Sequence, residues 1–233
     1  MLEMGGQAMS GALDSAPAAP RVVGGLEDTG LRRSQDAYLL VRRPVEVLLS
    51  LAVLLIALPV LAVCAVAIAL DSPGGVLFRQ ERVGEGGRLF TILKLRSMVV
   101  TAPVYSSKIG ADDPRITRVG RLLRLSGLDE LPQLVNVIRG DLSLVGPRPE
   151  MKFIVDGYEP WQRRRHLVRP GITGWWQIHH RTGDPMHLRT QDDLHYIRHL
   201  GPLLDLRIAL MTPVVMLRGA LLALTSKRRK PTG

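Results

Sequence analysis

The chain has 233 residues, a formal net charge of +10 at pH 7 and 46% apolar residues. This balance suits one compact domain with appendages, and it indicates an anionic partner and a membrane surface. Aromatic residues make up only 4% of the chain, so we expect no nucleic-acid partner, because single-strand binders stack bases on aromatic side chains.

Residues 1–36 are rich in Gly, Ala, Ser and Pro and show no sustained hydrophobic periodicity. A segment of this kind buries too little apolar surface to offset the entropy of ordering it, so we expect a disordered tail. We expect no signal peptide, because the first long apolar run follows Arg42-Arg43-Pro44, far from the N-terminus.

The run 47–70 contains no charged residue and is long enough for a membrane helix. Pro59 at its centre forces a kink, and each half would be roughly 17 Å long, about half of a hydrocarbon core of roughly 30 Å. Arginines flank both ends, so the positive-inside rule does not decide between the two topologies. A kinked transmembrane helix and a re-entrant helix-break-helix both remain open.

Cys64 is the only cysteine, which excludes an intrachain disulfide, and a lone thiol in this run is most simply a small hydrophobic residue.

Two short apolar stretches, 76–83 and 88–95, surround Gly84-Glu85-Gly86-Gly87 and predict a β-hairpin. This glycine cluster lacks the spacing of a phosphate loop. From Arg115 onward the apolar spacing becomes helical. The stretch 203–224 is interrupted by three charged residues, which favours a helix lying in the membrane interface. The basic tail 226–233 would meet anionic headgroups or be solvated.

Asp129 and Glu130 precede Leu131-Pro132-Gln133 at the start of a predicted helix. The helix dipole favours ionised carboxylates there. An ionised Asp129 could attack a phosphoryl group or hold a divalent cation, and Glu130 could add a metal ligand or accept a proton. The alternative is structural, with Asp129 capping the helix and Glu130 favouring its dipole.

Cations are dense around this pair, and several stand next to Gly or Pro. Arg148 lies between two prolines, a rigid setting that could aim its guanidinium at a phosphate. A solvated basic face is an equal alternative for Arg118, Arg121 and Arg139. The cations within 40 residues of the pair are Lys94, Arg96, Arg115, Arg118, Arg121, Arg124, Arg139, Arg148 and Arg169.

Other residues with chemical potential carry weaker signals. His195 and His199 are four apart, and His179 and His180 are adjacent, but no zinc-binding motif accompanies them, so we expect no zinc site. Ser126 and Ser143 lack the context of a hydrolase elbow. The adjacent tryptophans Trp175 and Trp176 could anchor at a membrane interface, stack on a base or sugar, or pack in the core.

Taken together, these segments resemble the bacterial sugar transferase family, the monotopic polyprenyl-phosphate phosphoglycosyl transferases. The resemblance covers about residues 40–220. It rests on FRQERVGEGGRLFTILKLRSM (78–98), DPRITRVGRLLRLSGLDELPQLVNVIRGDLSLVGPRPE (113–150), RPGITGWWQI (169–178) and LDLRIALMTP (204–213).

The resemblance implies an α+β, mostly helical fold, in which a re-entrant membrane helix kinked at Pro59, a small β-hairpin and interfacial amphipathic helices surround a cytoplasmic catalytic domain. The implied division is a disordered tail (1–36), the re-entrant helix (37–72), the catalytic domain with interfacial helices (73–225) and a basic tail (226–233). It places the protein in the bacterial inner membrane with its catalytic domain on the cytoplasmic face, and the basic interfacial helices leave room for a homodimer.

The resemblance also implies a two-step reaction. Asp129 would attack the β-phosphate of a UDP-sugar, releasing UMP and leaving a phosphosugar-aspartyl intermediate from which polyprenyl phosphate takes the sugar phosphate. Mg²⁺ would bind the diphosphate, with Asp129 and Glu130 as its ligands, or Glu130 would serve as a base. The residues implied in substrate binding are Lys94, Arg96, Arg115, Arg124, Gln133, Arg148 and Arg169.

Two departures from the family pattern and one alternative function stand beside this resemblance. The KFRSM-type block reads KLRSM here, and Gly127 replaces a frequent Ser, which puts any role of that hydroxyl in doubt.

The sequence does not identify the sugar, whose discriminating contacts we expect in residues 179–200. The alternative is a non-enzymatic, membrane-anchored basic domain that binds nucleic acid or acidic lipid.

Overall fold

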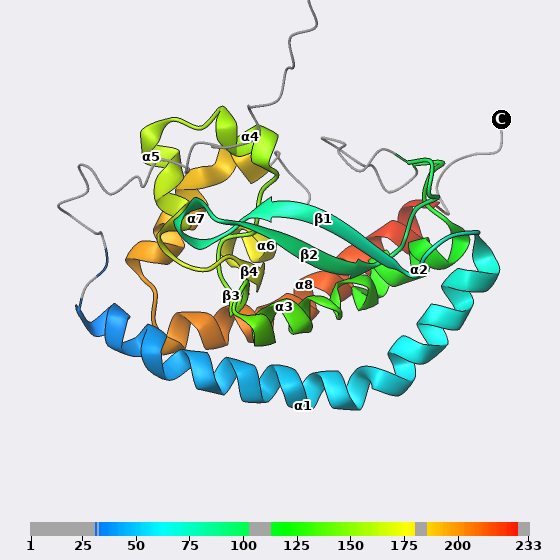
Figure 1. Cartoon of the computed structure of the whole chain (residues 1–233), viewed down its shortest axis with the longest axis horizontal. Coiled ribbons are helices and arrows are strands. Elements are labelled where there is room, and N and C mark those ends of the chain that lie inside the picture. Colours follow the sequence, from blue (N-terminus) through cyan, green and yellow to red (C-terminus); the bar gives the residue numbers. More distant parts are fainter. Residues whose placement is uncertain (1–30, 32, 103–112, 180–185, 228–233) are drawn as a thin grey trace, which may run out of the picture.

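The computed structural model describes residues 31, 33–102, 113–179 and 186–227. Its longest element, α1 (Arg33–Asp71), lies along one side of the molecule, and its two ends lie at opposite ends of the long axis (Figure 1). The helix continues through Pro44 and Pro59, so the expected helix-break-helix is one bent helix. A proline removes only one backbone hydrogen bond, and the neighbouring bonds carry the helix past it.

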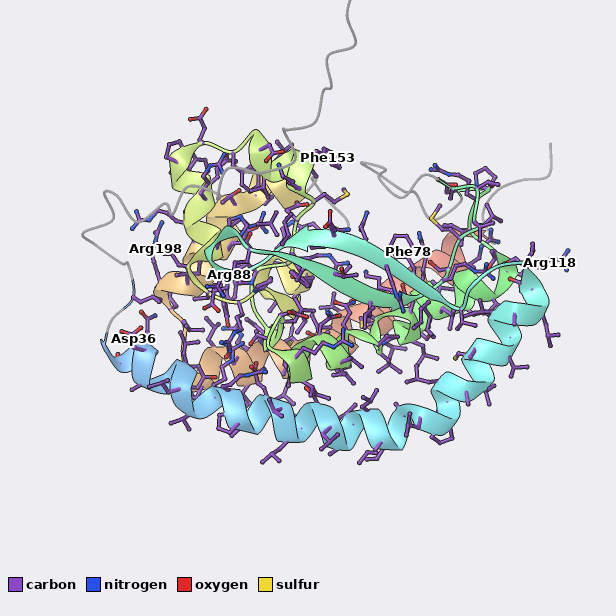
Figure 2. All side chains as sticks on the ribbon, viewed as in Figure 1. Asp36, Phe78, Arg88, Arg118, Phe153 and Arg198 are labelled. Atoms are coloured by element: carbon purple, nitrogen blue, oxygen red, sulfur yellow. The ribbon has the colours of Figure 1, made fainter. Side chains whose placement is uncertain are left out.

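The exposed surface of α1 is largely apolar. Its most apolar window has a mean hydropathy of 3.0 and is only 11% buried, which makes α1 the one helix in the described part of the chain that is long and apolar enough to cross a membrane. Figure 2 shows side chains on the outer side of α1 extending away from the rest of the fold. Leu48 and Leu55 are among the exposed leucines of this helix. That α1 re-enters a bilayer stays a prediction.

The N-terminal half of α1 is fixed to the remainder of the fold by buried charges. Arg42 Nε lies 2.8 Å from Glu46 Oε1, and Arg42 Nη1 lies 3.0 Å from Asp205 Oδ2. Arg42 also donates to the Ser143 hydroxyl, and the Leu144 amide donates to Glu46 Oε1 over 2.9 Å. Buried charges require such pairing, so this half of α1 has a fixed position against the short strand Ser143–Val145 and the helix Pro202–Lys227 that it contacts. The helix also begins before residue 37, within the last residues of the expected tail; the remainder of that tail and residues 228–233 lie outside the described residues.

The predicted β-hairpin is confirmed. Strand β1 (Leu77–Val83) pairs antiparallel with β2 (Leu89–Leu95), in a register that runs from Leu77 opposite Leu95 to Val83 opposite Leu89. A 3₁₀ turn, η1 (Glu85–Gly87), joins them, and Gly86 and Gly87 take positive φ angles of 63° and 80°. Glycine adopts these angles without strain, which explains the cluster between the strands.

The remaining elements are short, apart from the last helix. They are α2 (Arg118–Ser126), η2 (Leu128–Glu130), α3 (Gln133–Arg139), β3 (Ser143–Val145), α4 (Lys152–Asp156), α5 (Pro160–Arg163), η3 (Arg164–Leu167), β4 (Gly171–Thr173), α6 (Trp175–His179), η4 (Met186–Arg189), α7 (Thr190–Arg198) and α8 (Pro202–Lys227). Strands β3 and β4 form a parallel pair, with Ser143 opposite Gly171. The described fold is therefore mostly helical with two small sheets, which confirms the expected class.

Figure 1 shows α3 and α8 between α1 and the hairpin, with α4 and α5 farthest from α1. The largest buried cluster joins β3, α6, α7 and α8. Ile208 of α8 is fully buried, whereas Leu203 and Leu210 on the same helix are exposed. One face of α8 therefore packs on the core, and an apolar face remains exposed, as it does on α1. That α8 lies in a membrane interface stays a prediction.

Candidate active site

Asp129 lies in a sharp connection between α2 and α3. Gly127 ends α2 in the left-handed region, with φ at 74°, and a Cβ there would lie 2.0 Å from Met216 Cε of α8. The backbone angle favours glycine at this position, and a larger residue would also have to displace the flexible end of the Met216 side chain. The 3₁₀ turn η2 follows at once and carries Asp129 and Glu130.

The Asp129 carboxylate has no hydrogen bond or ion pair to any described residue, although the residue is only 8% exposed. Neither η2 nor α3 has a side-chain cap, and Pro132 is the N-cap residue of α3. The structural alternative in which Asp129 caps a helix is therefore wrong. A buried carboxylate without partners is costly in a merely structural role, and such groups concentrate at functional sites.

Glu130 has the opposite environment. Its Oε1 atom accepts from Lys94 Nζ over 2.9 Å and from Arg148 Nη2 over 3.0 Å. Burial would raise the pKa of the Glu130 carboxyl, but Lys94 and Arg148 together hold that pKa well below its usual range. Glu130 is thus a fixed anion that holds two cations beside Asp129.

Burial is the largest electrostatic effect at Asp129, and the pKa of its carboxyl lies above its usual value despite the nearby cations. Burial raises the pKa of the Asp129 carboxyl, Lys94 and Arg124 lower it, and the negative charge of Glu130 raises it. Arg124 is oriented by Ser97, whose Oγ accepts from Arg124 Nε over 2.8 Å. The site therefore presents one free carboxylate among three positive side chains.

These residues line a cavity of about 780 Å³, a volume that suits a small-molecule substrate. One part of its wall is polar and contains the acidic pair with Lys94, Arg124 and Arg148. Another part is apolar and comes from the two long helices. These residues are Val53 of α1 and Val215 and Met216 of α8.

Arg96 lines the same cavity, but its guanidinium holds the end of α1. Nη2 donates to the carbonyls of Ile68 and Ser72 over 3.3 and 2.6 Å, and Nη1 donates to Pro73 over 2.5 Å. Ile68 lies in the last turn of α1, where carbonyls lack partners within the helix, and Ser72 and Pro73 follow the helix directly, so Arg96 holds both the end of α1 and the chain that leaves it. Gly74, with φ at 116°, leaves the space, because a Cβ there would lie 2.3 Å from Arg96 Nη1.

Three further residues implied in substrate binding do not line the cavity. Arg115 pairs with Asp113 at 2.5 Å between Nη2 and Oδ2, and Arg169 Nε lies 3.2 Å from Glu85 Oε2. Gln133 is buried, and its Nε2 has no hydrogen-bond partner among the described residues. The structure therefore brings together Asp129, Glu130, Lys94, Arg124 and Arg148, and it gives Arg96 a contact with α1.

Sequence reasoning missed some members of the site. Ser97 orients Arg124, yet its only sequence signal was its place in the KLRSM block, directly after Arg96. Gln177 and Thr212 also line the cavity. Thr212 belongs to the LDLRIALMTP segment, whereas Gln177 follows the two tryptophans of α6.

The two carboxylates fit a magnesium ion. Asp129 has both oxygens free, and Glu130 Oε2 accepts no hydrogen bond from the described residues, so hard oxygen ligands are available on adjacent residues. Within the described part of the chain, no three acidic, imidazole or thiol side chains form a metal-binding group. Mg²⁺ typically binds through one or two carboxylates and substrate phosphates, so the donor set suits an ion that arrives with a diphosphate.

Comparison with known proteins identifies the family of the chain. The family model described as bacterial sugar transferase matches residues 37–219. The UDP-N-acetylgalactosamine-undecaprenyl-phosphate N-acetylgalactosaminephosphotransferase of Aeromonas hydrophila is 39% identical over 189 residues, which are 78% of this chain and 45% of that protein.

Two relatives named UDP-glucose:undecaprenyl-phosphate glucose-1-phosphate transferase extend the comparison. The Escherichia coli K12 protein is 39% identical over 74% of this chain and 39% of its own length. The Caulobacter vibrioides protein is 45% identical over 66% of this chain and 61% of its own length. The chain thus spans less than two thirds of each of these relatives. Because the family model matches most of its length, the chain belongs to the bacterial sugar transferase family.

Proposed function

We propose that the protein transfers a sugar 1-phosphate from a UDP-sugar to polyprenyl phosphate and releases UMP. The observation that carries this proposal is the contrast between the two adjacent acids. Asp129 is free and faces the cavity, whereas Glu130 is held by Lys94 and Arg148. One carboxylate is therefore available as a nucleophile, and the other fixes the positive charge around it.

In the first step, an oxygen of Asp129 attacks the β-phosphorus of the UDP-sugar. The bond between this phosphorus and the bridging oxygen breaks, and the electron pair leaves with UMP. In the second step, a phosphate oxygen of the polyprenyl phosphate attacks the same phosphorus and displaces the aspartate. Asp129 is regenerated as a carboxylate, so neither step requires a redox partner.

The cations of the site serve both steps. Phosphoryl transfer spreads negative charge over the equatorial oxygens, and Lys94, Arg124 and Arg148 lie on the wall where that charge develops. A magnesium ion held by Asp129 and Glu130 would neutralise further charge on the diphosphate. Because Glu130 holds Lys94 and Arg148, and Ser97 holds Arg124, before the substrate binds, these side chains need little reorganisation during the reaction.

Glu130 fits the role of an electrostatic anchor better than that of a base. Lys94 and Arg148 hold the pKa of its carboxyl well below its usual range, and such a carboxylate has little tendency to take a proton at neutral pH. The attacking groups, an aspartate in its ionised form and a phosphate oxygen, carry no proton that a base would have to remove. The proposed reaction therefore needs no general base.

The exposed apolar surfaces fit an acceptor that resides in a bilayer. Val53, Val215 and Met216 continue the cavity wall onto α1 and α8, whose other apolar side chains are exposed. The names of the relatives specify undecaprenyl phosphate as acceptor. We accordingly propose that α1 re-enters the bacterial inner membrane from the cytoplasmic face, which would keep the cavity at the membrane surface.

UMP release from a panel of UDP-sugars, with undecaprenyl phosphate and Mg²⁺, tests the proposal and identifies the sugar. We expect Asp129→Asn to lower turnover by roughly 10³-fold or more. Asp156→Asn is the matched control, because that aspartate forms an exposed surface pair with Lys152. A wild-type protein that releases no UMP from any donor but binds acidic lipid in a salt-dependent way would support the non-enzymatic alternative.

A further inference from the structure

Arg148 lies in the loop 147–150. Each of the four backbone carbonyls of this loop accepts a hydrogen bond from another segment. Its two prolines have no backbone N–H, so the loop can supply few hydrogen bonds of its own. Four donors from outside the loop hold it instead. These contacts are Gly171 N to Pro147 O at 2.8 Å, Arg165 Nη2 to Arg148 O at 2.8 Å, Arg82 Nη1 to Pro149 O at 3.1 Å and Val83 N to Glu150 O at 2.9 Å.

Arg165 is the member of this set that contacts Arg148 itself, and it is the donor with a fully buried charge. It is only 2% exposed, and Nη1 donates to the Tyr158 hydroxyl over 2.5 Å. Its Nη2 lies 2.7 Å from Asp193 Oδ2 of α7. One planar guanidinium therefore joins three elements, which a lysine ammonium could not reproduce.

Arg148 needs such support because its side chain is long and partly exposed. Its guanidinium must hold Glu130 and, in the proposed reaction, a phosphate of the donor at the same time. A misplacement of about 1 Å can cost roughly 10²-fold in activity. Fixing the Arg148 backbone removes part of the ordering cost that binding would otherwise carry.

We propose that Arg165, held by Asp193, is a positioning residue that aims Arg148 at the diphosphate of the nucleotide-sugar donor. The inference rests on the proposed function and goes beyond it, because it extends the site to a buried ion pair outside the cavity. It also connects α7 with the phosphate-binding loop. Asp193 and Arg165 touch no substrate; they act through the carbonyl of Arg148.

A double-mutant cycle tests this role with UDP and Mg²⁺ as the probe. UDP affinity is measured in detergent for wild type, Arg165→Met, Arg148→Met and the double variant. We expect Arg165→Met to weaken UDP binding roughly tenfold or more in the wild-type background and less than twofold when Arg148 is absent. Equal weakening in both backgrounds would show that Arg165 does not act through Arg148.

Two further variants keep the test decisive. Arg163→Met is the matched control, because Arg163 is exposed and donates to the carbonyls of Tyr158 and Asp156, outside the loop; we expect unchanged UDP affinity. Arg165→Lys keeps the buried charge and replaces Arg165→Met in the cycle if the latter does not fold. Wild-type UDP affinity in Arg165→Lys would overturn the proposal.

UMP release on the same samples separates the two claims. Coupled UDP affinities without any UMP release from wild type would contradict the proposed reaction and support the positioning role. UMP release together with uncoupled UDP affinities would support the proposed reaction and contradict the positioning role of Arg165.

Discussion

Lys94 Nζ lies 2.9 Å from Glu130 Oε1, which ties the end of the hairpin strand β2 to the turn η2 that carries Asp129. The pair gives two adjacent acids different environments. Glu130 is neutralised by Lys94 and Arg148, whereas Asp129 lies close to the same charges with its oxygens free. Paired carboxylates with separated environments commonly divide their roles in catalysis.

Lys94→Met should move the acid limb of the pH profile. Lys94 favours the ionised form of Asp129 and lowers the pKa of its carboxyl, so removing the ammonium raises that pKa. A nucleophile that must be ionised then loses activity at a higher pH as the solution is acidified. The limb in kcat/KM for the donor should move upward relative to wild type. Arg121→Met, an exposed change on α2, should leave the limb in place; an unmoved limb in Lys94→Met would argue against Asp129 as the titrating group.

Arg96→Met should affect the fold more than donor binding. Arg96 holds three carbonyls at the end of α1, and hydrogen bonds from a charged donor contribute about 2 kcal/mol each. We expect a lower Tm in detergent with a donor KM within about twofold of wild type. The phosphate-binding role implied by the family resemblance predicts the reverse, a raised KM with an unchanged Tm.

Gly127→Ser should destabilise the turn that carries Asp129. The left-handed backbone costs a residue with a side chain about 1–2 kcal/mol, and the new Cβ would collide with Met216 Cε. Combining the change with Met216→Ala should recover the part of the lost free energy of unfolding that is due to the collision. Unfolding in denaturant measures this free energy. If Gly127→Ser matches wild type in stability, glycine is not required here, and the Ser frequent in the family fits the same turn.

Local patterns in the sequence predicted the hairpin, the helical stretches and the long apolar helix, because alternation and helical spacing report directly on local structure. The strands β3 and β4 have only three residues each, too few for periodicity to register. At Pro59 the sequence left a kinked continuous helix and a helix-break-helix open, because it shows the proline but not the contacts on either side of it; the structure has one continuous helix.

Sequence reasoning named some residues of the cavity wall but not their arrangement. Lys94 and Arg96 are two residues apart, yet Lys94 faces Glu130 and Arg96 turns to the end of α1. Arg165 lies in the run Arg163-Arg164-Arg165, a pattern typical of solvated surface. Its burial follows from Asp193, 28 positions later, and only tertiary structure brings the two together.

The most direct test of the central claim is to trap the intermediate on Asp129. Purified protein is incubated with the preferred UDP-sugar and Mg²⁺ without acceptor, and its peptides are analysed by mass spectrometry. We predict a stoichiometric burst of UMP, a sugar phosphate on the peptide that contains Asp129, and loss of this label when undecaprenyl phosphate is added. UMP release at full rate from Asp129→Asn, or a label on a different residue, would contradict the account.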